Sequence, residues 1–121
     1  MKIAIDLDAT ITMYPKVFSA FCRAFRTTGH VVYVVTDRVA GTESEVMGML
    51  DELEIDYDFV KITNDKASYV TEQGIDVLFD DTDRYFADLP ASVAVLKVRG
   101  HYNFDYADRK WLYTEESGRK I

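Results

Sequence analysis

Apolar residues fall into two patterns that alternate along the chain. Five short runs, rich in aliphatic and β-branched residues, predict strands at residues 1–5, 30–35, 57–62, 77–79 and 93–98. The segments between these runs carry apolar residues at helical spacing instead. Strands that alternate with helices form parallel sheets. The pattern therefore predicts a single α/β domain, with a parallel sheet of about five strands and helices on both faces.

Caps and helix breakers place the helices between these strands. The pattern predicts one helix between Pro15 and Gly29, one that begins at Thr42 or Ser44, and one between Asn64 or Asp65 and Gly74. A short solvated helix is expected at residues 83–89, with Asp83, Arg84 and Asp88 on its surface and Pro90 at its end.

The composition suits one ordered domain. The chain has 121 residues, against about 150 in a typical domain. Hydrophobic residues make up 48% and charged residues 29%, which excludes global disorder. Fourteen basic and 21 acidic residues leave a net charge of −7, and that charge repels nucleic-acid backbones. We therefore expect no non-specific nucleic-acid binding.

The cysteine and the N-terminal run favour a reducing compartment without a membrane. Cys22 has no second cysteine to pair with, and His30 and His101 are too few for a zinc cluster. Asp6 and Asp8 interrupt the N-terminal apolar run before it reaches the length of a signal-peptide core. No stretch approaches the roughly 18 apolar residues of a membrane span. We expect a cytoplasmic protein that does not bind membranes.

Oxygen-bearing side chains directly follow three of the predicted strands. Asp6 and Asp8 follow the first strand, Thr36 the second, and Asp80 and Asp81 the fourth. The carboxyl ends of parallel strands share one edge of the sheet, where ligands bind in such folds. One strand-end aspartate is often only a turn former, but four converging carboxylates repel one another unless a cation lies among them. Oxygen ligands of this charge suit Mg²⁺, with a nearby lysine as further compensation.

The order of these residues resembles the motifs of the haloacid dehalogenase (HAD) superfamily of phosphotransferases. Residues 6–10, with the sequence DLDAT, match its first motif, D-x-D-x-T/V. Thr36, a lysine ahead of the fourth strand and the Asp80-Asp81 pair resemble the second, third and fourth motifs. The agreement extends over residues 1–98. The resemblance implies a HAD-like fold and a Mg²⁺-dependent phosphatase.

The resemblance also implies catalytic roles. Asp6 would attack phosphorus and form an aspartyl-phosphate, and Asp8 would protonate the leaving oxygen and later activate water. Thr36 and a lysine would hold the phosphoryl oxygens. Lys66 is favoured over Lys61 for that role, because it begins the helix that leads to the fourth strand.

The metal ligands follow from the same resemblance. Mg²⁺ would be held by the Asp6 side chain, the Asp8 backbone carbonyl and Asp81. Asp80 also counts among the metal-site residues, where it would support the ligands rather than bind the ion directly. Two features depart from the family pattern. Ala9 stands where a glycine is common, and no acidic residue lies three or four positions beyond Asp81.

The spacing leaves no room for a cap domain. Only 27 residues separate Asp8 from Thr36, and 29 separate Thr36 from Lys66. Predicted helices and strands already fill both intervals. The chain therefore resembles capless family members, whose open sites take bulky phosphorylated partners or are closed by a neighbouring subunit. We expect a phosphorylated substrate, which can be a nucleotide or a larger phosphorylated molecule. Assembly into a homo-oligomer is left open.

Residues 99–121 form a tail, rich in aromatic residues, that departs from the strand-helix pattern. Its similarity to the C-terminal segment of the capped 5′(3′)-deoxyribonucleotidase branch lies in His101, Tyr102, Asn103, Arg109 and Trp111. We expect Trp111 to pack on the sheet edge or its helices. We also expect the tail, from this chain or a second subunit, to border the phosphate pocket near Thr12 and Tyr14.

Three other interpretations fit part of the pattern. A catalytically silent phosphate-binding or interaction module on the same fold has no need of both Asp6 and Asp8. A metal-dependent nuclease of the PIN kind also carries strand-end acids, but the net charge of −7 and the placement of Thr36 and Lys66 disfavour it. A response-regulator receiver would carry an aspartate at the end of the third strand, where residues 62–63 are Ile-Thr.

Overall fold

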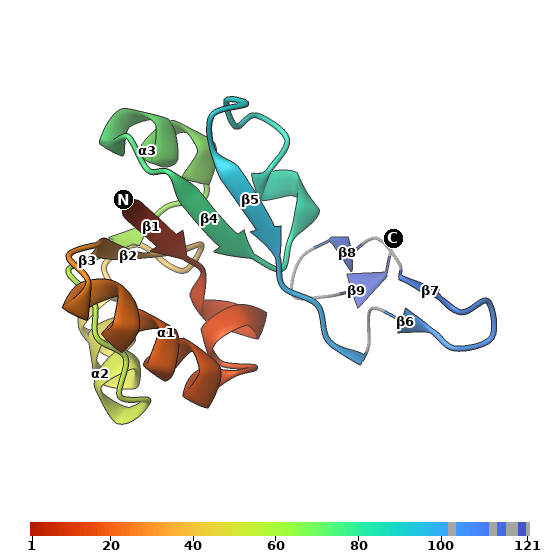
Figure 1. The fold of residues 1–121 in the computed structure, drawn as a ribbon, viewed down its shortest axis with the longest axis horizontal. Coiled ribbons are helices and arrows are strands. Elements are labelled where there is room, and N and C mark those ends of the chain that lie inside the picture. Colours follow the sequence, from red (N-terminus) through yellow and green to blue (C-terminus); the bar gives the residue numbers. More distant parts are fainter. Residues whose placement is uncertain (102–103, 112–113, 116–118, 121) are drawn as a thin grey trace.

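Five parallel strands form the sheet of this protein in a computed structural model that describes residues 1–101, 104–111, 114–115 and 119–120. The strands are β1 (Lys2–Ile5), β2 (Val31–Thr36), β3 (Phe59–Ile62), β4 (Val77–Asp80) and β5 (Ala94–Lys97). Their order is β3-β2-β1-β4-β5, and every neighbouring pair is parallel (Figure 1). The predicted α/β domain with a five-stranded parallel sheet is confirmed, and the described residues include no cap domain.

Three helices connect the strands: α1 (Pro15–Thr27), α2 (Glu43–Glu52) and α3 (Lys66–Gln73). The α1 and α2 helices cover one face of the sheet and α3 covers the other (Figure 1). The prediction of helices on both faces is confirmed. Asp65, rather than Asn64, caps α3, because its carboxylate accepts a hydrogen bond from the Ser68 amide at 3.2 Å. None of the helices in the described ranges has the length and apolar character needed to cross a bilayer.

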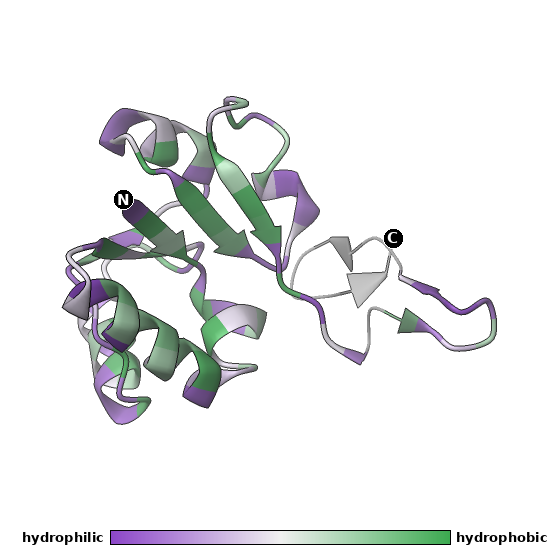
Figure 2. Cartoon of the chain, viewed as in Figure 1, coloured by the Kyte–Doolittle hydropathy of each residue, from purple (hydrophilic) through white to green (hydrophobic). Residues whose placement is uncertain are grey.

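Side chains alternate between the two faces of the sheet and build two cores. In β1, Ile3 and Ile5 pack toward α1 and α2, whereas Ala4 packs toward α3. The first core also contains Phe18 and Cys22 of α1 and Val46 and Leu50 of α2, and the second contains Tyr33, Val35, Val70 and Leu78. The central strands are apolar along most of their length, which is typical of parallel strands covered on both faces (Figure 2).

The strand order creates a natural binding position between β1 and β4. The chain moves outward from β1 through β2 to β3, then returns across the sheet to pair β4 with the other side of β1. Ligands in open α/β sheets bind at the carboxyl ends of strands where the order reverses in this way. The Asp6 amide donates a 2.9 Å hydrogen bond to the Phe79 carbonyl, so the residues that follow β1 and β4 are held side by side.

The predicted helix at residues 83–89 is wrong. The structure has only a single 3₁₀ turn, η2 (Asp83–Tyr85), followed by turns. Side-chain contacts hold this turn against the sheet edge, since the Lys97 ammonium contacts the Asp83 carboxylate at 2.5 Å and the Tyr85 hydroxyl contacts Asp37. These tertiary contacts outweigh the local helical spacing.

The tail forms two short hairpins beyond β5 (Figure 1). Antiparallel pairs join β6 (Phe104–Asp105) to β7 (Lys110–Trp111) and β8 (Thr114–Glu115) to β9 (Arg119–Lys120). The expected packing of Trp111 on the sheet edge or its helices is wrong. Trp111 stays 52% exposed, because the hairpin pairs it with Phe104, and the Arg99 guanidinium lies 5.4 Å from its ring centroid.

Part of the tail does approach the region expected from the sequence. The Tyr14 hydroxyl donates a 2.8 Å hydrogen bond to the Arg99 carbonyl, and β8 lies beside η2. Tyr14 and Thr12 themselves do not line the pocket described below. Tyr102 and Asn103, which carried part of the tail resemblance, lie outside the described residues.

Cys22 provides a test of the packing of α1. Its side chain is fully buried, and this burial, with a smaller contribution from Asp56, raises the pKa of the thiol to about 12. Because the thiolate is the reactive form, we expect labelling by a thiol reagent at mildly alkaline pH to follow unfolding in urea. Rapid labelling of the native protein would contradict the buried position.

Candidate active site

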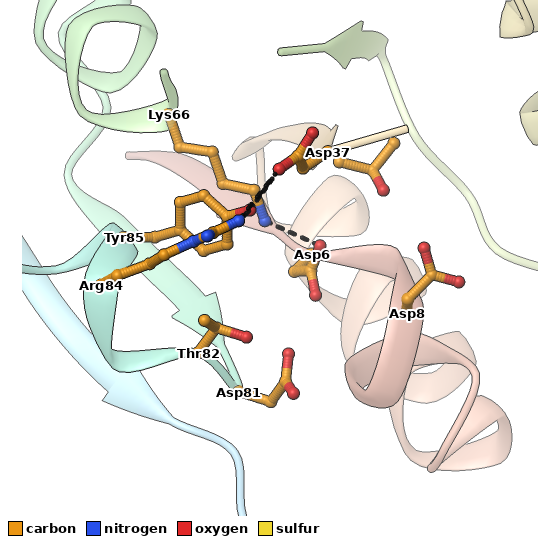
Figure 3. A pocket seen from close by; sticks show the side chains of 9 residues that line it. Asp6, Asp8, Asp37, Lys66, Asp81, Thr82, Arg84 and Tyr85 are labelled. Carbon is orange, nitrogen blue, oxygen red and sulfur yellow. Dashed lines mark hydrogen bonds and ion pairs between the residues drawn. The ribbon is translucent and has the colours of Figure 1, made fainter. Parts of the chain in front are cut away.

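The strand-end side chains meet in one pocket at the carboxyl edge of the sheet (Figure 3). The pocket has a volume of about 220 Å³ and is lined by Asp6, Asp8, Thr36, Asp37, Lys66, Asp81, Thr82, Arg84 and Tyr85. Five of these residues were predicted from the sequence. Asp80, the sixth predicted residue, is fully buried behind the pocket wall.

Asp6 is held at the end of β1 by two side chains. Its Oδ1 accepts a hydrogen bond from the Lys66 ammonium at 2.8 Å, and its Oδ2 accepts one from the Thr10 hydroxyl at 3.3 Å. The side chain is almost completely buried, yet it faces the pocket (Figure 3). These contacts fix the orientation of the carboxylate toward any molecule in the pocket.

Asp8 lies on an irregular helical turn, η1 (Leu7–Ile11), and lines the same pocket as Asp6. Asp8 has extended backbone angles, and Ala9 lies in the left-handed region with φ 57° and ψ 14°. A residue with a Cβ pays about 1–2 kcal/mol for that conformation, whereas a glycine would adopt it without that cost. The Thr12 hydroxyl accepts a 3.0 Å hydrogen bond from the Ala9 amide and stabilises the turn.

The structure brings Lys66, and not Lys61, to the pocket. Lys66 is the first residue of α3, and its ammonium lies 2.8 Å from an oxygen of Asp6 and 2.7 Å from one of Asp80. Lys61 lies on β3 with its ammonium 5.6 Å from the centroid of the Tyr69 ring. The Asp65 cap explains why Lys66 rather than Lys61 lies in the pocket. It begins α3 at Lys66, whose side chain reaches the strand ends.

Three carboxylates form a buried acid cluster around Lys66. Oxygens of Asp6, Asp80 and Asp81 lie within 4.8 Å of one another. Burial raises the pKa of Asp6 well above its ordinary value, Lys66 opposes the shift, and Asp80 and Asp81 add to it. Burial and the Asp80 charge likewise raise the pKa of Asp81. Burial opposes the charged form of Lys66, but Asp6 and Asp80 outweigh it and raise the lysine pKa.

This acid cluster suits a hard divalent cation. Three carboxylates exceed the single ammonium by two negative charges when all are ionised, and every donor is an oxygen. Asp80 has both oxygens engaged, since Oδ2 accepts from Lys66 at 2.7 Å and Oδ1 accepts from the Thr82 amide at 3.0 Å. Asp6 and Asp81 face the pocket and are the carboxylates that could hold a cation there.

Thr36 ends β2 with its hydroxyl directed to the same pocket. The side chain is fully buried, and its Oγ1 has no hydrogen-bond partner among the residues that the structure describes. Leaving a buried hydroxyl unsatisfied costs about 1–3 kcal/mol. A ligand oxygen in the pocket would satisfy it.

The rim of the pocket contains residues that the sequence analysis missed. Tyr85 and Arg84 from η2 both contact the Asp37 carboxylate, at 2.5 Å and 3.3 Å, which joins the ends of β2 and β4. The Lys66 ammonium lies 4.1 Å from the centroid of the Tyr85 ring, so the ring covers the lysine. Their positions in the sequence could have indicated this, because residues just beyond strand ends commonly bind ligands in this fold class.

A second arginine contacts the other side of the site. Arg38 follows β2 and forms an ion pair with Asp8 at 2.7 Å. In Figure 3, Asp8 lies across the pocket from Arg84 and Tyr85. No pattern in the sequence indicates a role for Arg38.

Comparisons of this chain with models of protein families, with curated proteins and with solved structures found no match. The site is therefore characterised by its own geometry. That geometry combines a fixed carboxylate, a buried ammonium, an unsatisfied hydroxyl and a surplus of acid. Such a set can bind a metal ion together with an anionic group that carries oxygen atoms.

Replacing Lys66 by alanine leaves three buried carboxylates without their cation. We expect the free energy of unfolding at neutral pH without metal to fall by about 3–5 kcal/mol, the usual loss when one partner of a buried ion pair is removed. Urea unfolding measures this loss. Lys61→Ala is the matched control and should cost less than about 1 kcal/mol, because it removes only a cation–π contact. Equal losses from the two variants would contradict the assignment.

Proposed function

We propose that this chain is a Mg²⁺-dependent phosphomonoester hydrolase that acts through an aspartyl-phosphate on Asp6. The observation that carries the proposal is the 2.8 Å contact of Asp6 with Lys66 inside the acid cluster. This contact aims one carboxylate at the pocket and places a cation where a phosphoryl group would need it. The motif order that resembles the HAD superfamily supports the same activity.

The proposed reaction has two steps. An oxygen of Asp6 bonds to phosphorus while the ester P–O bond breaks, and Asp8 gives its proton to the leaving oxygen, which departs as an alcohol. Water then attacks the phosphorus while Asp8 takes a proton from it. The bond between phosphorus and the Asp6 oxygen breaks, which releases inorganic phosphate and restores the Asp6 carboxylate. The Lys66 ammonium and the Thr36 hydroxyl hold the other phosphoryl oxygens during both steps.

The acid cluster supports Mg²⁺ as the cofactor. Asp6 and Asp81, with the backbone carbonyl of Asp8, would hold the ion, and Asp80 would support the group through Lys66. When bound, Mg²⁺ supplies positive charge that shields the attack of a carboxylate on an anionic substrate. When all three carboxylates are ionised they repel one another, and a divalent ion would relieve this repulsion.

The pocket supports a substrate whose phosphoryl group enters while the rest stays outside. Its volume is about 220 Å³, and its lining consists of charged residues, two threonines and one tyrosine. No cap among the described residues restricts what lies beyond the rim. A nucleotide or a larger phosphorylated molecule fits this arrangement.

One observation favours a catalytically silent phosphate-binding module as a second candidate. Both oxygens of Asp8 accept hydrogen bonds from Arg38, so the carboxylate already has a structural partner, and phosphate binding alone requires no general acid. A silent module would bind phosphate without any turnover. Turnover of a phosphorylated substrate separates the two candidates.

Replacing Asp6 by asparagine removes the nucleophile and keeps the side-chain shape. Turnover should fall to background in a screen of phosphorylated metabolites and p-nitrophenyl phosphate with Mg²⁺. Stability should be maintained or rise, because Lys66 keeps its contact with Asp80 and one of three repelling carboxylates is gone. Asp51→Asn, on the exposed side of α2, is the control and should retain activity. Wild-type turnover by Asp6→Asn would exclude the mechanism, and a wild-type chain that binds phosphate without turnover would favour the silent module.

Removal of metal provides an independent test. EDTA should abolish hydrolysis, and Mg²⁺ should restore it, because an anionic substrate cannot enter the acid cluster without added positive charge. Mg²⁺ with beryllofluoride should raise the melting temperature of the wild-type chain, as any ligand of the native state does. The same mixture should not change the melting temperature of Asp6→Asn. Full activity in chelator would point to different chemistry.

A further inference from the structure

The Asp8 carboxylate is gripped at both oxygens by one guanidinium. Arg38 Nε donates to Asp8 Oδ2 at 3.0 Å, and Arg38 Nη2 donates to Asp8 Oδ1 at 2.7 Å. The third nitrogen, Nη1, contacts the Met49 sulfur of α2 at 3.3 Å. The guanidinium therefore links η1 to α2, and its position is fixed by Asp8 on one side and by Met49 on the other.

Asp8 needs such a link because its own turn does not hold the side chain. The carboxylate is 43% exposed and lies on the irregular turn η1, where its backbone is extended beside the left-handed Ala9. Among the described residues, the Asp8 carboxylate has no hydrogen bond other than the two from Arg38. Without Arg38, this side chain would sample several rotamers.

We infer that Arg38 is the positioning residue for Asp8, holding its carboxyl group where it can exchange a proton with the leaving oxygen. The inference rests on the proposed function. Two N–H groups occupy two of the roughly four lone-pair sites of the carboxylate, so a site remains for the proton that passes to the ester oxygen as the P–O bond breaks. Two hydrogen bonds from one planar guanidinium fix both the position and the plane of the carboxyl group. A lysine ammonium, as a single point charge, would not do this.

A residue that acts through Asp8 should matter only when the leaving oxygen needs a proton. Aryl phosphates such as p-nitrophenyl phosphate release a weakly basic oxygen, whereas alkyl phosphates such as glycerol phosphate release a strongly basic one. Loss of Arg38 should therefore slow the first step for alkyl phosphates far more than for aryl phosphates. A general loss of packing or of positive charge would slow both alike.

The experiment compares Arg38→Ala, Arg38→Lys, Asp8→Asn and the double variant Arg38→Ala/Asp8→Asn. Release of the alcohol or phenol in a single turnover with Mg²⁺ reports the first step alone. For glycerol phosphate we expect Arg38→Ala to slow this step by about 10²-fold, the scale of a misplaced catalytic group, and Arg38→Lys to slow it less. For p-nitrophenyl phosphate the change should be small. The double variant should be no slower than Asp8→Asn, because Arg38 then has no carboxylate to position.

Arg26 provides the matched control. Its ion pair with Asp58 is 3.2 Å long, and the side chains are 43% and 27% exposed, against 27% and 43% for Arg38 and Asp8. Arg26→Ala should leave both substrates unaffected. Melting temperatures confirm that each variant folds, and Arg38→Lys, which keeps the charge and most of the stem, is used where Arg38→Ala is unstable.

Two results would overturn the inference while leaving the proposed function in place: equal losses for the two leaving groups, or additive losses in the double variant. Both would mean that Arg38 acts through packing or charge. A wild-type chain that hydrolyses neither these probes nor the metabolite panel would overturn the proposed function and this inference together.

Discussion

One buried lysine holds the carboxyl edge of the sheet together. The Lys66 ammonium is 1% exposed and contacts Asp6 beyond β1 and Asp80 at the end of β4, while its backbone begins α3. A buried charge without a partner costs several kcal/mol, so β1, β4 and α3 must meet in the arrangement that pairs these three groups. The same contact aims Asp6 at the pocket. Stability of the fold and geometry of the site therefore both depend on the contacts of the Lys66 side chain.

The acid cluster is a local conflict within an otherwise consistent fold. The two apolar cores satisfy the strands and helices on both faces of the sheet. At the strand ends, by contrast, Asp6 and Asp81 bear raised pKa values and Thr36 keeps an unsatisfied hydroxyl. Unfavourable contacts of this kind persist where surrounding structure enforces them, and they are typical of functional sites. A metal ion and a phosphoryl group would resolve each of them.

The rim of the pocket differs from its floor. The floor is built from side chains that are almost fully buried, whereas Asp8 and Arg38, and Asp37 and Arg84, pair at partly exposed positions. Asp8 is held at both oxygens by Arg38. The Asp37–Arg84 ion pair is longer, at 3.3 Å, and exposed ion pairs of that kind are typically worth about 0–1 kcal/mol, so this part of the rim can rearrange. A rigid floor with a partly adaptable rim suits the proposed function, in which the phosphoryl group would be fixed and the remainder of the substrate would not.

The sequence alone determined the sheet, its helices and most of the floor. Apolar runs and helical spacing are local signals, and the shared edge of parallel strands brings Asp6, Thr36 and Asp81 together whatever the details of the loops. Only the tertiary structure decided between Lys66 and Lys61, because the answer depends on where the Asp65 cap starts α3. It also decided the rim. Local spacing at residues 83–89 predicts a helix, but contacts of η2 with β5 and with Asp37 are made by residues distant in sequence. Trp111 likewise follows its hairpin partner rather than the sheet, because strand pairing sets the face on which a side chain lies.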